Sequence, residues 1–223
     1  MLKEKYTPLY YLSALGAGGL SVSFFIYLMF LVPHKGSPMS TFDFVYPVIL
    51  EGTWLSIVSV IAIIFIVIFS VFHFKLLYWN IKQYNVFKKT KAFETLVNSN
   101  AEVTLMALPL TYAMTINILF VLGALFVPNL WSVIEYLFPL ALLGFAIVGY
   151  YAIDIFTDYF SRLIRTGNFD FTKNNNLSQM VSIFTFSMVG VGFAAPGAMS
   201  HYLVVNAIGL FGAIFLSQLQ FCF

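Results

Sequence analysis

The chain has 223 residues, of which 61% are hydrophobic, 19% are aromatic and only 9% are charged. Soluble domains carry about a quarter of their residues as charged side chains, so this composition predicts an integral membrane protein. The net charge of +2 is too small for the dense basic surface that nucleic-acid binding requires. The single cysteine, Cys222, excludes an intrachain disulfide and a cysteine-based zinc site.

Six apolar stretches are each long enough to cross a hydrocarbon core of about 30 Å. Apolar continuity and interfacial aromatic residues place the spans at Pro8–Val32, Trp54–Tyr78, Val103–Val127, Trp131–Phe156, Leu177–Ala195 and Tyr202–Phe221. The first is longer than a signal-peptide core, so we expect it to be retained as a helix. Residues 1–223 are therefore predicted to form a single all-α transmembrane domain of three hairpins.

Basic residues predict the orientation of these spans, because they concentrate in cytoplasmic segments. Successive connecting segments fall on alternate sides of the membrane, and Lys35 is the one basic residue on the first of these sides. The other side carries Lys3, Lys5, Lys75, Lys82, Lys88, Lys89, Lys91, Arg162, Arg165 and Lys173. We therefore expect a multi-pass protein of the cell (inner) membrane with a cytoplasmic N-terminus.

Two connecting segments contain further structure. The stretch 42–50 in the first external segment is apolar around Pro47 and either lies in the interface or extends the second helix. The cytoplasmic connector 80–102 mixes lysines and glutamates with apolar residues, which predicts a short amphipathic helix. Asn174-Asn175-Asn176 supplies turn and capping residues before the fifth span.

Small and hydroxyl residues follow one face of each odd-numbered helix. The faces are Gly16, Gly19 and Ser23 in the first helix, Thr104, Leu108, Thr111 and Thr115 in the third, and Ser178, Ser182, Thr185, Gly192 and Pro196 in the fifth. The second and fourth helices instead contain the bulky stretches 61–69 and 140–145, which lipid accepts on all sides. We expect odd helices inside and even helices outside. Helix packing is the simpler explanation of the small-residue faces, and a narrow pore is the alternative.

Prolines add a second feature to the same helices. Pro109 and Pro196 remove backbone donors, and interrupted helices within membranes often border cavities. Pro139 does the same in the fourth helix, so kinks that serve packing remain the default interpretation.

Three segments resemble one known family: Ala14-Leu15-Gly16-Ala17-Gly18-Gly19-Leu20-Ser21, Met106-Ala107-Leu108-Pro109-Leu110-Thr111, and Gly190-Val191-Gly192-Phe193-Ala194-Ala195-Pro196-Gly197. The chain is similar to the tellurite-resistance/dicarboxylate transporter family, which includes TehA and the plant slow-type anion channels, and most closely to its TsoY-like branch. The resemblance implies five hairpins, with odd helices around a central pore and even helices in an outer ring. Six helices would supply three of those hairpins, so we expect an incomplete domain. The family's gating phenylalanine lies in a later odd helix and has no counterpart in this chain.

Ionisable residues lie toward the predicted membrane faces. Asp154 and Asp158 are one turn apart, and Arg162 follows Asp158 at the spacing of a helical ion pair. Glu51 and Glu135 are predicted to be interfacial. The lack of a central acid argues against a proton-driven carrier.

The three histidines do not suggest a haem or metal site. His73 is expected near the inner end of the second helix and His201 near the outer end of the sixth, so they could not ligate one haem. His34 could approach His201 outside the membrane, but two imidazoles alone do not make a metal site. Ser200-His201 lacks the rest of a hydrolytic constellation, so we expect neither an enzyme nor a bound cofactor.

The function predicted from these features is a membrane anion channel or transporter for a small anion or organic acid, embedded in the lipid bilayer and possible as a homo-oligomer. Its pore-lining or pore-shaping residues are predicted to be Gly16, Gly19, Ser23, Pro109, Thr111, Thr115, Thr185, Gly192 and Pro196. The alternative is a non-transporting membrane subunit or assembly scaffold. A haem-binding redox subunit is a third hypothesis, which the histidine positions disfavour.

Overall fold

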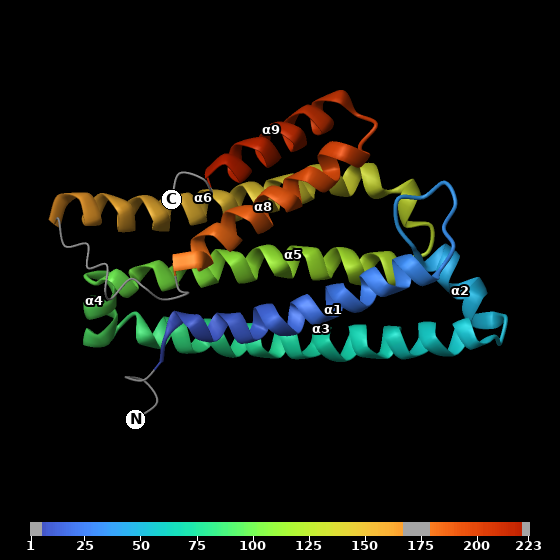
Figure 1. The fold of residues 1–223 in the computed structure, drawn as a ribbon, viewed down its shortest axis with the longest axis horizontal. Coiled ribbons are helices and arrows are strands. Elements are labelled where there is room, and N and C mark those ends of the chain that lie inside the picture. The colour runs from blue at the N-terminus through green and yellow to red at the C-terminus, as the bar shows by residue number, and fades with distance from the viewer. Residues whose placement is uncertain (1–5, 167–178, 220–223) are drawn as a thin grey trace.

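The computed structural model describes residues 6–166 and 179–219, and within these ranges it contains helices and connecting segments without strands (Figure 1). The long helices are α1 (Tyr11–Leu31), α3 (Trp54–Phe87), α5 (Ala107–Phe126), α6 (Ile134–Thr166), α8 (Met180–Met199) and α9 (Leu203–Leu219). The shorter elements are η1 (Pro8–Tyr10), α2 (Phe42–Leu50), α4 (Lys91–Val97), η2 (Asn100–Met106) and η3 (Leu130–Ser132). The all-α fold class is confirmed.

Five of the helical segments are long and apolar enough to cross a membrane. They are Pro8–Leu31, Trp54–Phe87, Asn100–Phe126, Ile134–Arg165 and Met180–Met199. The apolar helix α9 adds a sixth segment of 17 residues. The described parts of the chain therefore form a polytopic helical membrane protein. The capping residues predicted at 174–176 lie outside the described residues.

Two helices run further than the sequence predicted. α3 continues to Phe87 instead of ending at Tyr78, and α6 continues to Thr166 instead of ending near Phe156. The 34 residues of α3 span about 51 Å at 1.5 Å per residue, more than the bilayer requires. Tyr84 and Phe87 are buried in the core of the molecule, so packing extends α3 into a region predicted as connector.

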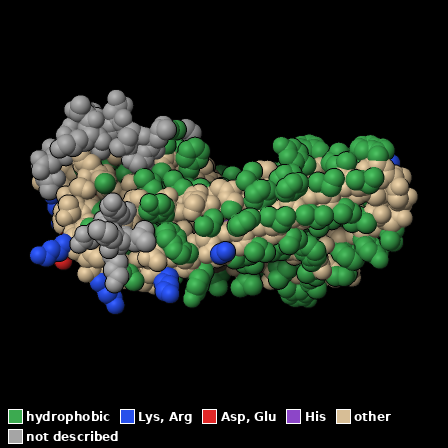
Figure 2. Space-filling view, turned by 90° about the horizontal axis from the view of Figure 1, so that it is seen from below, with side chains coloured by type: hydrophobic (Ala, Val, Ile, Leu, Met, Phe, Trp, Pro, Cys, Tyr) green, Lys and Arg blue, Asp and Glu red, His purple; other side chains and the backbone are tan. Residues whose placement is uncertain are grey.

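Lysine and arginine side chains are concentrated at one end of the molecule. Figure 2 shows the face over α3, where hydrophobic side chains cover most of the length and basic side chains gather toward the end that carries α4. This distribution is what a helical bundle placed across a bilayer would have. The predicted amphipathic helix between residues 80 and 102 is confirmed as α4, which begins after Thr90.

At the opposite end, α2 is a helix of its own. Gly52 has a φ of +68°, a left-handed conformation that interrupts the helix between α2 and α3. Thr53 then starts α3, with its backbone N–H donating to Ser56 Oγ at 3.0 Å. The apolar stretch 42–50 therefore does not extend α3.

The first, third and fifth spans, which are α1, α5 and α8, form a row through the molecule. α1 packs against α5 and α5 packs against α8, while α3 packs on α1, α6 on α5 and α8, and α9 on α8. Figure 1 shows α3 and α9 at opposite edges of the bundle. The predicted inner position is confirmed by burial for the third and fifth spans, which are 61% and 56% buried against 39% for the fourth. The first span is not more buried than the second, because α1 lies at the end of the row: both helices of the first hairpin are 28% buried.

Candidate functional site

The most polar buried surface lies on α3, the helix predicted to be bulky on all sides. Its buried residues recur every three or four positions: Ser56, Ser59, Ala62, Ile66, Ser70, His73, Leu77, Asn80, Tyr84 and Phe87. The stretch 61–69 does present large side chains to lipid, but serines, a histidine and an asparagine face inward. The prediction of a uniformly bulky second span is therefore wrong for its packed face.

His73 stands at the junction of three helices. The side chain is fully buried and sits close to the middle of α3, not near its inner end as predicted, because α3 extends to Phe87. Nδ1 lies 2.8 Å from the carbonyl oxygen of Ala14 in α1, and Nε2 lies 3.0 Å from Thr115 Oγ1 in α5. A carbonyl oxygen only accepts, so Nδ1 carries a proton and donates it to Ala14. Both ring nitrogens are thus engaged, which leaves neither free to ligate a haem iron.

Gly18 makes the space that His73 occupies. A Cβ atom at this position would lie 2.8 Å from His73 Nδ1 and 2.7 Å from both Met114 Cγ and Ile118 Cδ1. Only glycine therefore lets α1, α3 and α5 meet at this level. The prediction from the glycine run selected its neighbours Gly16 and Gly19, where a Cβ would meet nothing within 4 Å.

The three predicted threonines bond to backbone carbonyls. Thr111 Oγ1 donates to Ala107 O at 2.7 Å and lies 3.2 Å from Tyr11 O in α1. Thr185 Oγ1 donates to Val181 O at 2.7 Å and lies 3.0 Å from Met106 O at the start of α5. Thr115 Oγ1 lies 2.9 Å from Thr111 O and 3.0 Å from His73. The Thr111 and Thr185 hydroxyls connect α1, α5 and α8, and the Thr115 hydroxyl contacts His73.

The remaining predicted residues are not gathered at this junction. On α1, Gly16, Gly19 and Ser23 are turned away from the packed face that holds Gly18, and Ser23 Oγ donates to Gly19 O at 2.8 Å. Their role as pore-lining residues stays a prediction.

The predicted prolines and Gly192 have local structural roles. Pro109 lies in the first turn of α5, where its missing N–H costs nothing, directly after the 3-10 segment η2. Gly192 packs directly on the ring of Phe145 in α6. Pro196 is buried near the end of α8.

A cluster of tyrosines occupies the next turns toward the lysine-rich end. The Tyr11 and Tyr112 hydroxyls are 3.4 Å apart, and the Tyr11 ring also contacts Tyr84 with centroids 6.1 Å apart. Tyr151 of α6 stacks on Tyr112 at 6.5 Å. Four helices thus contribute one aromatic ring each, a contact that no spacing within a single helix could indicate.

Asn80 fastens the N-terminal segment to α3. Its Nδ2 donates to Tyr10 O at 3.2 Å, and its Oδ1 accepts from the Tyr6 hydroxyl at 3.1 Å. Burial raises the pKa of the Tyr6 hydroxyl, so the group stays protonated and keeps its donor.

A carboxylate makes polar contacts at each end of α6. Arg162 pairs with the buried carboxylate of Glu102 in η2, whereas the sequence predicted Asp158 as its partner. Glu135 lies at the other end, where it accepts from the backbone N–H of His201 at 2.8 Å and from Ser200 Oγ at 2.7 Å. The interfacial position of Glu135 stays a prediction.

His34 and His201 have separate partners. His34 Nδ1 lies 2.8 Å from Val32 O and 3.0 Å from Ser40 Oγ, while His201 Nδ1 lies 2.7 Å from Glu135. Among the residues that the structure describes, no three His, Cys, Asp or Glu side chains come together as a metal site.

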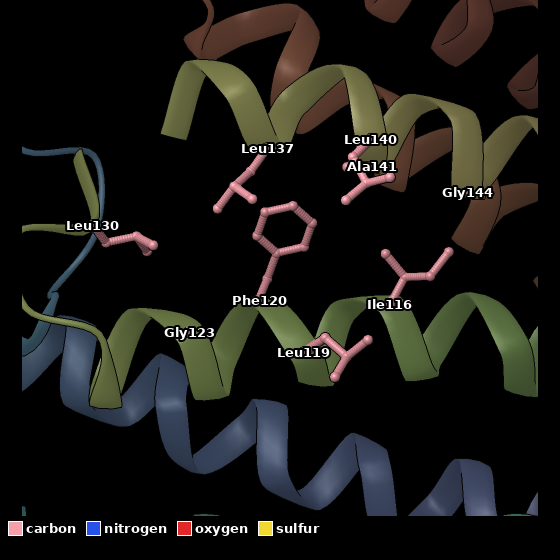
Figure 3. A pocket seen from close by; sticks show the side chains of 9 residues that line it. All are labelled: Ile116, Leu119, Phe120, Gly123, Leu130, Leu137, Leu140, Ala141 and Gly144. Atoms are coloured by element: carbon pink, nitrogen blue, oxygen red, sulfur yellow. The ribbon is translucent and has the colours of Figure 1, made fainter. Parts of the chain in front are cut away.

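A groove of about 340 Å³ separates α5 from α6 (Figure 3). Ile116 and Phe120 of α5 face Leu137 and Ala141 of α6 across it, and Leu119 and Leu140 also line it. All of these side chains are apolar, so the groove suits hydrocarbon and does not suit a hydrated ion. It lies apart from the polar junction at His73.

Comparisons with family models, with curated proteins and with solved structures found no match to this chain. The fold and the packing therefore define the class, a multi-pass helical membrane protein with a buried polar junction between α1, α3 and α5.

Proposed function

We propose that this protein is a channel or transporter for a small anion or organic acid, with a path bordered by α1, α5 and α8. The contiguous row of these three helices carries the proposal. Each packs on the next, and each is paired with the helix that follows it in the chain: α3 with α1, α6 with α5 and α9 with α8. This is the arrangement that the resemblance to the tellurite-resistance/dicarboxylate transporter family implies for neighbouring hairpins.

The free face of α1 supports the same proposal. Gly16 and Gly19 leave an open strip beside which a Cβ would find no neighbour within 4 Å. Small residues and main-chain dipoles are suited to a narrow anion path, because they let the backbone approach the ion. In this proposal a second copy of the chain or further hairpins complete the enclosure.

Orientation belongs to the same proposal. The lysine-rich end near α4 would face the cytoplasm of a cell whose inner membrane holds the protein. The N-terminal segment before η1 would then be cytoplasmic.

A second candidate function is a non-transporting subunit or assembly scaffold. The observation that favours it is that the Thr111 and Thr185 hydroxyls reach backbone carbonyls of neighbouring elements. Hydroxyls used in this way stabilise helix association and need no permeant ion.

Flux measurements on purified protein in liposomes separate the two functions. Transport requires that nitrate or chloride enter protein-containing vesicles faster than empty ones. Gly19→Leu would fill the open strip on α1 without a clash, so it should lower flux by about tenfold while the fold is retained. Gly123→Leu is the matched control, because Gly123 is equally unobstructed but borders the apolar groove. Folded protein without flux would favour the scaffold, and equal flux in both variants would remove α1 from the path.

A further inference from the structure

The hydrogen-bond partners of His73 suit both the neutral and the protonated form of the ring. In the neutral ring, Nδ1–H donates to Ala14 O and the lone pair of Nε2 accepts from the Thr115 hydroxyl. In the protonated ring, Nε2–H donates to Thr115 Oγ1, and the Thr115 hydroxyl turns to donate to Thr111 O, which is 2.9 Å away. Every group keeps a partner in both states.

Proton uptake needs a route to the buried ring, and Thr115 supplies it. His73 is fully buried, whereas Thr115 is only half-buried and touches Nε2. One proton can be taken up at Nε2 from the side of Thr115, and the only other change is the rotation of one hydroxyl.

The charge that this proton brings has no carboxylate beside it. No Asp or Glu occurs within α1, α3 or α5, the helices that meet at His73. The nearest titratable side chains along them are Tyr11 of α1, Tyr112 of α5, and Lys75 and Tyr78 of α3, of which Lys75 and Tyr78 are exposed. An uncompensated charge inside a membrane is costly, so an anion that approaches the protonated ring from the half-buried side of Thr115, on the path helix α5, would stabilise it.

We propose that His73 is a proton-binding site whose protonated form is balanced by the permeant anion, so that proton binding and anion binding favour each other. The mutual effect is required by linkage, since an anion that favours the imidazolium is itself bound better when the ring is protonated. The proposal rests on the anion transport proposed above. It replaces the expectation that a chain without a central acid does not use protons.

Nitrogen-15 NMR of the three histidines in lipid bilayers tests proton binding directly, with His34→Gln and His201→Gln to assign the signals. As the pH of the sample is lowered, the His73 signal should change from a ring protonated only at Nδ1 to a doubly protonated ring. The midpoint should lie at higher pH in nitrate than in the bulkier gluconate. A ring that stays neutral throughout, or a midpoint that is the same in both anions, would overturn the proposal.

Variants of Thr115 give a matched pair for the same measurement. Thr115→Ser keeps the hydroxyl and should titrate as the parent does. Thr115→Val removes the acceptor for Nε2–H and should move the midpoint down by about one pH unit. An unchanged midpoint in Thr115→Val would contradict the role of the hydroxyl.

Nitrate flux supplies an independent readout. Flux through the parent protein should rise as the pH falls, by up to about tenfold per pH unit above the midpoint, while His73→Gln should be flat. Gln keeps a donor for Ala14 O but does not titrate in this range. Absence of flux at every pH would end the transport function without affecting the NMR result, and pH-dependent flux in His73→Gln would overturn the coupling.

Discussion

The first and last hairpins of this protein are held together in different ways. Between α1 and α3, Ser21 Oγ lies 2.9 Å from Ser70 Oγ and 3.2 Å from Ile66 O, and His73 and Asn80 add further bonds across the interface. Between α8 and α9, the backbones themselves meet, because a Cβ on Gly209 would lie 2.6 Å from the Cα of Gly197. The first interface carries several side-chain hydrogen bonds, whereas the last depends mainly on close backbone contact, with a hydrogen bond from Asn206 Nδ2 to Gly197 O beside it.

Lipid explains why both solutions are used. Acyl chains are as apolar as leucine, so burying apolar surface between two membrane helices gains little, and association needs polar bonds or close contact. The middle hairpin has fewer polar bonds and less close contact than the other two, because the apolar groove separates α5 from α6. Its helices are instead fixed through their neighbours, α6 by Glu102 and α5 by the threonine contacts.

The largest effect is expected from a side chain placed in the glycine contact. Gly209→Leu would force α8 and α9 apart, because the obstructing atoms belong to the backbone of Gly197 and cannot rotate away. We expect a loss of about 3 kcal/mol in the free energy of unfolding, measured by titration with a denaturing detergent. Gly16→Leu, where nothing lies within 4 Å, is the control and should change stability little. Equal losses in both variants would show that backbone contact does not hold this hairpin.

An intermediate effect is expected from Asn80 in the first hairpin. Asn80→Leu removes the donor to Tyr10 O and leaves the Tyr6 hydroxyl without its amide acceptor. We expect the free energy of unfolding to fall by about 1 to 2 kcal/mol in the same titration. Protection of the α1 amides from hydrogen exchange should fall with it, while α8 and α9 keep theirs. A loss of protection confined to α8 and α9 would contradict the separation between the two hairpins.

The smallest effect is expected from one serine of the same interface. Ser21→Ala removes the bonds to Ser70 and Ile66 and should cost about 0.6 kcal/mol, the average for such bonds within membranes. Ser13→Ala is the control, because its hydroxyl donates to Tyr10 O at an exposed position. If the Ser21 variant were as stable as the Ser13 variant, the bonds of Ser21 would not stabilise the first interface, and only those of His73 and Asn80 would remain to do so.

The spans were predictable from hydropathy, but the inward faces were only partly so. In the second span, the bulky stretch 61–69 dominates the average composition, while Ser56, Ser70, His73 and Asn80 follow the helical period and face inward together. Burial depends on the phase of a residue around the helix, and the prediction for this span considered only its composition.

The glycine run in α1 shows a limit of another kind. Gly16, Gly18 and Gly19 give α1 two different faces that are both small, so the sequence does not determine which one meets another helix. The tyrosine cluster and the Arg162–Glu102 pair combine elements far apart in the chain, and no pattern within one helix encodes them.

α3 is an uninterrupted helix of 34 residues, and its second half runs from the buried His73 to the lysine-rich end. Lys82 stands nine positions beyond His73, about 14 Å along the axis of a stiff helix. A stiff helix moves as a unit, so a tilt of α3 at its lysine-rich end would also displace the imidazole and its two hydrogen bonds. α3 therefore connects the lysine-rich end of the molecule directly to the buried contacts of His73.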